Sequence, residues 1–164
     1  MSVRDESLEA NQQYAAGFNL GKLPTPPARK LAAVVCMDAR LMPDQFLGLS
    51  TGDAHIIRNA GGIVTDDALR SLIISHKLLG TNEFFVINHT DCGMLTFTDD
   101  HLRNELRDAT GLDPSDLQFY TFKDLEENVR AQVEKIKSNP YLPNDIPVHG
   151  FIYQVEDGRL REVV

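Results

Sequence analysis

Residues 31–36 read Leu-Ala-Ala-Val-Val-Cys, and residues 83–89 read Glu-Phe-Phe-Val-Ile-Asn-His. Each is a short and nearly uninterrupted apolar run, which is typical of a strand that is covered on both faces of a sheet. Residues 54–59, AHIIRN, predict another short strand around Ile56 and Ile57. Because strands covered on both faces belong to parallel sheets, the three stretches indicate a mostly parallel sheet at the centre of the fold.

A helix is predicted between the second and third of these strands. Residues 65–80, TDDALRSLIISHKLLG, carry apolar side chains close to helical spacing. Thr65 is a capping residue, acidic residues occupy the first turn, and Gly80 ends the pattern. A helix at this place is the crossover that two neighbouring parallel strands require.

A second helix and a last strand are predicted in the C-terminal part. Residues 121–140, TFKDLEENVRAQVEKIKSNP, have helical spacing, with Thr121 as the expected cap and Pro140 just beyond the end. Residues 149–163, HGFIYQVEDGRLREV, add a strand and a turn. The alternation predicts an α/β fold: a single domain with a mostly parallel central β-sheet flanked by helices.

The N-terminal part has a different character. Residues 5–18 predict a short helix, and LGKLPTPPARK at residues 20–30 is too rich in Pro and Gly to continue it. We therefore divide the chain into an N-terminal helical arm and linker, residues 1–30, and an α/β domain, residues 31–164, that contains both cysteines.

The composition excludes several classes of protein. The 164 residues carry a net charge of −8, which argues against a nucleic-acid partner because such binding needs clustered Lys and Arg. The N-terminal residues lack the pattern of a secretory signal, and no apolar run is long enough to span a membrane. The expectation is a soluble cytoplasmic protein without nucleic-acid or membrane partners, in which two cysteines favour a reactive or metal-binding pair over a disulfide.

Two short motifs follow the apolar runs. The first strand ends in CMDAR, residues 36–40, and the third ends in HTDCG, residues 89–93. The carboxyl ends of parallel strands are where such sheets bind ligands. Two thiolates and one imidazole, from Cys36, His89 and Cys92, are a ligand set that zinc favours, and three protein ligands leave a fourth position open.

A plain structural interpretation is also available. Cys36 would be a small buried hydrophobe, His89 a hydrogen-bonded end of its strand, and Cys92 an inert turn residue. This interpretation leaves Asp38 and Arg40 unexplained. If the chain stays extended past Cys36, alternation turns Cys36, Asp38 and Arg40 to the same side, so that a carboxylate and a guanidinium approach the same crevice.

Taken in order, CMDAR, RNAGG at residues 58–62 and HTDCG resemble the signature of beta-class carbonic anhydrases. The similarity covers about Leu31 to Phe97. The resemblance implies that Cys36, His89 and Cys92 bind Zn²⁺ and that Asp38 and Arg40 form a catalytic dyad, which makes residues 31–164 a zinc-binding catalytic domain. The implied function is reversible hydration of carbon dioxide to bicarbonate and a proton, by attack of zinc-bound hydroxide that the dyad orients.

The resemblance leaves the role of Asp38 open, because in some family members this carboxylate becomes a fourth zinc ligand. Those members share a tryptophan near a bicarbonate pocket, and this sequence has no tryptophan. We therefore expect the site to be open to water. Two rival functions remain: hydrolysis of carbon disulfide or carbonyl sulfide on the same zinc site, and a non-catalytic domain whose structural zinc is permanently closed by Asp38.

Further expectations concern the surroundings of the site. Gly61 and Gly62 permit a tight turn or bring backbone N–H groups to an anion, and Arg58 binds an anion or pairs with a carboxylate. The remaining histidines are not expected to be ligands: His55, His76, His101 and His149. The resemblance also implies a homodimer or homotetramer with the active site at the subunit interface, embraced by the N-terminal arm.

Overall fold

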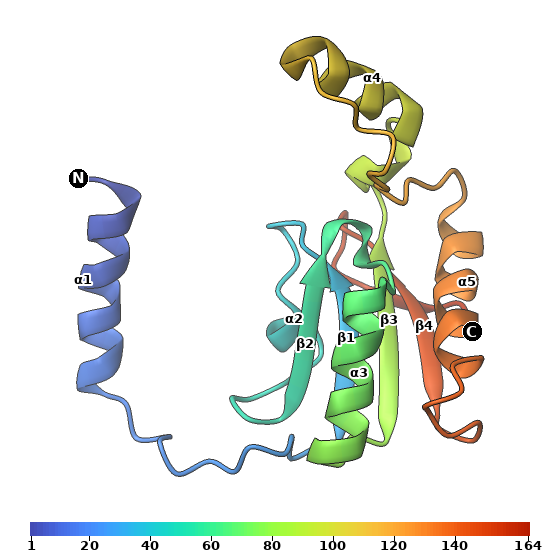
Figure 1. Ribbon diagram of the computed structural model, residues 1–164. Helices are drawn as coiled ribbons and strands as arrows, with labels where there is room; N and C mark the ends of the chain where they lie inside the picture. Colours follow the sequence, from blue (N-terminus) through green and yellow to red (C-terminus); the bar gives the residue numbers. More distant parts are fainter.

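The computed structural model describes residues 1–164 and contains one five-stranded sheet (Figure 1). The strands lie in the order β2-β1-β3-β4-β5. Their bounds are β1 Leu31–Cys36, β2 Ala54–Asn59, β3 Glu83–His89, β4 Val148–Tyr153 and β5 Leu160–Glu162. The pairs β1–β2, β1–β3 and β3–β4 are parallel, and only β5 pairs antiparallel, with β4. The predicted mostly parallel sheet is confirmed.

The two faces of the sheet are covered differently. Every residue of β1 is buried, because alternate side chains enter two separate apolar clusters. In the first cluster, side chains of α3 (Asp66–Leu79) and α5 (Leu125–Lys137) pack against the strands. The second cluster contains Cys36 and Cys92 and lies near the short helix α2 (Pro43–Phe46). Strand β2 is only half-buried, since it lies at the edge of the sheet.

The caps of the two covering helices show where local signals decide the structure. Thr65 caps α3 by accepting a hydrogen bond from the backbone N–H of Ala68, and Gly80 ends it with φ 75°, as predicted. The prediction of Thr121 as the cap of α5 is wrong, because Asp124 is the N-cap. Thr121 is held elsewhere: its backbone N–H and hydroxyl both donate to Asp99 Oδ1, at 3.0 and 2.7 Å.

Helix α4 (Asp99–Thr110) is absent from the sequence-based prediction. Thr98 caps it and Gly111 ends it with φ 72°, and none of its residues is fully buried. Figure 1 shows α4 beyond the carboxyl ends of the parallel strands, above the sheet.

Helix α1 (Val3–Ala16) begins two residues before the predicted start, because Ser2 and Asp5 form a capping box. None of its side chains is buried, and Figure 1 shows it standing apart from the sheet at the end of an extended linker. The molecule has no helix with the length and apolar character needed to cross a membrane.

Candidate metal centre

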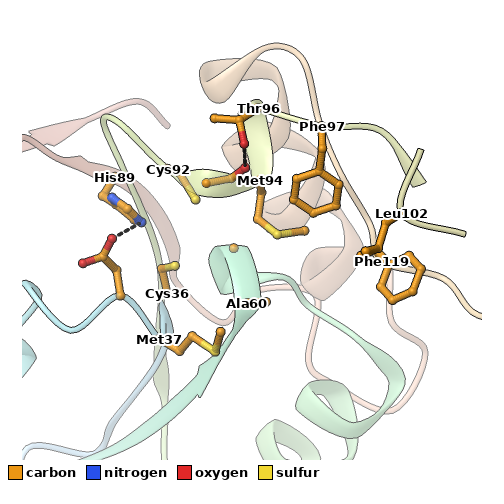
Figure 2. Close-up of a pocket in the computed structure, with 13 residues that line it drawn as sticks. Cys36, Met37, Ala60, His89, Cys92, Met94, Thr96, Phe97, Leu102 and Phe119 are labelled. Carbon is orange, nitrogen blue, oxygen red and sulfur yellow. Dashed lines mark hydrogen bonds and ion pairs between the residues drawn. The ribbon is translucent and has the colours of Figure 1, made fainter. Parts of the chain in front are cut away.

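Cys36, His89 and Cys92 come together at the carboxyl ends of two neighbouring strands. Cys36 is the last residue of β1, His89 is the last residue of β3, and Cys92 follows three residues later in a turn. One ligand atom from each residue lies within 4.8 Å of the other two, and all three side chains are buried. Figure 2 shows the three groups converging at one end of a pocket. The structure therefore brings together the three predicted ligands.

The imidazole of His89 is oriented as a metal ligand would be. Its Nδ1 donates to the carbonyl oxygen of Thr90 at 2.8 Å, because a carbonyl can only accept. That bond leaves the lone pair on Nε2, which is fully buried and has no hydrogen-bond partner. A histidine that binds a metal through one ring nitrogen usually donates a hydrogen bond from the other to a carbonyl or carboxylate. The orphaned nitrogen fits a metal ion.

The arrangement of the two thiols also favours a bound cation. A hydrogen bond from Cys92, together with backbone N–H groups of Asp38 and Gly61, lowers the pKa of Cys36 against the effect of burial. The pKa of Cys92 is raised, by its hydrogen bond to Cys36 and by burial. One thiolate thus suppresses ionisation of the other. A divalent cation between them would allow both to ionise, and two thiolates with one imidazole favour Zn²⁺.

Asp38 and Arg40 form a bidentate ion pair beside the three ligands. Arg40 Nε donates to Asp38 Oδ1 at 3.0 Å, and Nη2 donates to Oδ2 at 2.8 Å. The hydrogen bonds from Arg40 hold the pKa of Asp38 well below its usual range, although burial acts to raise that pKa. Asp38 Oδ2 lies 3.8 Å from His89 Nε2, so an ionised carboxylate faces the candidate metal position.

The chain does not stay extended past Cys36, so alternation along a strand is not what brings Asp38 and Arg40 to the site. The backbone N–H of Leu41 donates to the carbonyl oxygen of Asp38 at 3.0 Å, and the N–H of Arg40 donates to Asp38 Oδ1 at 2.9 Å. The chain therefore turns at Asp38 instead of continuing the strand. The short polar side chain bonds to the backbone two residues later, and this local bond replaces extension.

Two further residues hold this turn. Asp91 accepts a bond from Arg40 Nη1 at 2.8 Å through Oδ2, and its backbone oxygen accepts one from Nη2 at 3.1 Å. Arg58 donates to the carbonyl oxygens of Cys36 and Asp38, at 3.1 and 2.7 Å, so it fixes backbone and is not paired with a carboxylate. The motif contained Asp91, but only the fold reveals its contact with a residue 51 positions away.

A pocket of about 520 Å³ opens from the candidate metal position. The three ligand residues and Asp38 line one end of the pocket, and the rest of its lining is mainly apolar (Figure 2). The sequence singled out no role for six of the wall residues: Met37, Met94, Thr96, Phe97, Leu102 and Phe119. None of His55, His76, His101 and His149 lines this pocket.

Known proteins resemble this chain over its whole length. A family model described as carbonic anhydrase matches residues 31–160. Beta-carbonic anhydrase 1 of Mycobacterium tuberculosis is 47% identical, over 99% of both chains. The crystal structure of carbonic anhydrase from Streptococcus mutans superposes with a TM-score of 0.95 at 46% identity, covering 100% of this chain and 99% of the other. A carbon disulfide hydrolase of Acidithiobacillus thiooxidans is 34% identical, over 96% of this chain and 87% of its own.

The parallel sheet and the Cys-His-Cys group at its carboxyl edge define an α/β protein with a candidate transition-metal centre. The matches identify the family: this chain belongs to the beta-class carbonic anhydrases. Members of this family are zinc enzymes, so the family and the donor set agree on Zn²⁺ as the cofactor.

Proposed function

We propose that this protein catalyses the zinc-dependent, reversible hydration of carbon dioxide to bicarbonate and a proton. The observation that carries the proposal is the buried Nε2 of His89, which has no partner and lies between two thiols and an ionised carboxylate. Three donors leave one position of a tetrahedral ion for chemistry. The relatives named carbonic anhydrase support the choice of reaction.

The proposed roles follow from the geometry. Cys36, His89 and Cys92 hold the ion, whose Lewis acidity supplies a nucleophile from water near neutral pH. Asp38 is kept ionised by its pairing with Arg40 and therefore only accepts hydrogen bonds. It orients the nucleophile by accepting a hydrogen bond from it. Arg40 keeps Asp38 in that state and position. The apolar walls receive a substrate that carries no charge.

Stopped-flow hydration of carbon dioxide, at about pH 7 and about pH 8.5 on protein of measured zinc content, tests this function. We expect hydration at both values and faster hydration at the higher one, because a water-derived nucleophile needs its proton removed. Fully zinc-loaded protein that hydrates no carbon dioxide at either pH would contradict the proposal.

Carbon disulfide or carbonyl sulfide is a second candidate substrate for the same site. The relatives named carbon disulfide hydrolase and the apolar walls around Met94, Phe97 and Phe119 favour it. Both molecules are linear and carry an electrophilic carbon, so the demands on zinc and Asp38 are the same. Release of hydrogen sulfide from carbon disulfide, measured beside carbon dioxide hydration on one preparation, decides between them by the ratio of the two kcat/KM values.

Asp91→Asn is expected to lower kcat/KM for the preferred substrate by about two- to fivefold, since Arg40 loses one of its two carboxylate partners. The effect is modest because the Asp91 side chain is 72% exposed, and exposed ion pairs contribute at most about 1 kcal/mol. Asp67→Asn is the matched control, since Asp67 pairs with Arg70 on the exposed side of α3. Equal kinetics of the two variants would show that Asp91 does not support the dyad through Arg40.

We further propose that the chain forms a homodimer or homotetramer with the active site at the subunit interface. Support comes from the arm, in which apolar side chains of α1 and the linker are exposed: Leu8, Tyr14, Phe18, Leu20 and Leu23. A lone chain has no partner for this apolar surface. A second copy is the occupant that each arm can reach symmetrically.

Deletion of residues 2–20 is expected to weaken association at least about a hundredfold. Removing only two well-buried apolar side chains costs about 3 kcal/mol or more, and each 1.4 kcal/mol is a factor of about ten. Sedimentation equilibrium measures the change, with Ser7→Ala on α1 as a control that keeps the apolar side chains. A full-length chain that is monomeric at micromolar concentration would contradict the arm's role.

A cytoplasmic location is also part of the proposal. Cys36 and Cys92 are free thiols in the structure, and their sulfur atoms belong to one buried group. A reducing compartment keeps such a pair available for a metal, whereas an oxidising one promotes disulfides.

A further inference from the structure

The turn at residues 61–64 lies directly against the candidate metal ligands. Gly61 has φ 81°, and a Cβ at this position would lie 3.0 Å from Met94 Cγ. Gly62 has φ 62°, and its Cβ would lie 2.9 Å from the backbone nitrogen of Cys36 and 2.9 Å from Asn88 Nδ2. Gly61 also donates a backbone hydrogen bond to Cys36 and lines the pocket. Any shift of this turn therefore moves the surroundings of Cys36.

Three side-chain amides connect this turn to helix α5. Asn88 Nδ2 donates to the carbonyl oxygens of Gly61 and Gly62, at 2.9 and 3.2 Å. Asn128 Nδ2 donates to Asn88 Oδ1 at 2.7 Å, and Gln132 Nε2 donates to Asn128 Oδ1 at 3.0 Å. Gln132 Oε1 then accepts the backbone N–H of Val64 at 2.9 Å. This amide chain, Asn88–Asn128–Gln132, begins and ends on the same turn.

The amide chain is a costly arrangement for a core. Asn88 is 0% exposed and Asn128 is 9% exposed, where Val or Leu would pack without any need for partners. Removing one amide leaves buried donors and acceptors of its neighbours unsatisfied, and hydrogen bonds in such chains polarise one another. The apolar contacts of α5 involve Val133 and Ile136 in the cluster on the face away from Cys36. Packing of the helix thus does not account for the amides.

We propose that Asn128 and Gln132 are positioning residues for the metal centre. They hold the turn at residues 61–64 at both of its ends, through Asn88 at Gly61 and Gly62 and directly by Gln132 at Val64. The turn in its place holds Cys36 in position for the ion. The inference rests on the proposed zinc site. It adds helix α5, which supplies no lining residue of the metal-centre pocket, and it assigns that helix a role in metal retention.

The test compares zinc release from the purified zinc-loaded protein and three variants, using a chromophoric zinc chelator. Asn128→Leu replaces the central amide by an apolar side chain of similar size, and Gln132→Leu breaks the half-buried end of the amide chain. Val133→Ala is the matched control, because Val133 is also buried on α5 but packs against Gly150 on β4. Thermal unfolding of all the proteins measures general destabilisation.

We expect Asn128→Leu to release zinc about tenfold faster and to bind it about tenfold more weakly, with a smaller change of the same sign in Gln132→Leu. Val133→Ala should lower Tm as much and leave zinc release unchanged. If both amide variants release zinc within about twofold of the unaltered protein, the amide chain only stabilises the fold. If Asn128→Leu does not fold, Gln132→Leu against Val133→Ala decides alone. Zinc release is measured without any substrate, so its result is independent of whether the protein hydrates carbon dioxide.

Discussion

Cys36→Ser is expected to remove zinc and hydration activity together. Cys36 is a buried thiolate donor at the end of β1, and a serine hydroxyl does not ionise there to replace it. Structural zinc sites are worth roughly 10–16 kcal/mol at neutral pH, so one of four positions contributes about 3–4 kcal/mol. Zinc should therefore bind roughly 10²–10³-fold more weakly. Metal analysis of the purified variant and competition with a chelator measure this loss.

Val35→Ala controls for damage to the strand. Val35 is the buried neighbour of Cys36 in β1, and shortening it should cost about 2 kcal/mol of stability. This variant should keep one zinc ion per chain and nearly all of its activity. A Cys36→Ser protein that retains zinc with affinity within about tenfold of the original would show that the ligand set is wrong.

The central strands and the ligand positions were predictable because each depends on a local property. The run at residues 31–36 is apolar throughout, and β1 has the predicted bounds because it is covered on both faces. The same holds for residues 83–89 and β3. Once two parallel strands are neighbours, their carboxyl ends must meet, and this places Cys36 close to His89 and Cys92 without knowledge of any side-chain contact.

The elements that were missed depend on contacts between distant residues. Thr121 does not cap α5, because Asp99 accepts its hydrogen bonds from 22 positions away. Helix α4 has no fully buried residue, and the signals that could have indicated it are its caps, Thr98 and Gly111, and the helical spacing of Leu102 and Leu106. The turn after Asp38 follows from a bond between its carboxylate and the backbone, which the apolar pattern of the strand does not contain.

Asp38→Asn is expected to lower kcat/KM by roughly 10²–10³-fold and to leave zinc content unchanged. The amide keeps the shape of the carboxylate but loses the charge that pairs with Arg40. Arg40 holds the pKa of Asp38 well below its usual range, so Asp38 protonates only as the pH falls far into the acid range. The loss of activity should therefore be the same at about pH 7 and about pH 8.5. Asp145→Asn, at an exposed position outside the metal-centre pocket, should change neither quantity.

The same variant separates the catalytic site from a structural one. If Asp38 were a permanent fourth ligand, Asp38→Asn would weaken zinc binding as Cys36→Ser does, and the unaltered protein would be inactive even at alkaline pH. The structure favours the orienting role, because moving Asp38 onto the ion would break two hydrogen bonds from the Arg40 side chain. Arg40 is itself anchored by Asp91, which opposes that movement. Retained zinc with lost turnover in Asp38→Asn is the result that an open site requires, and lost zinc is the result that a closed site requires.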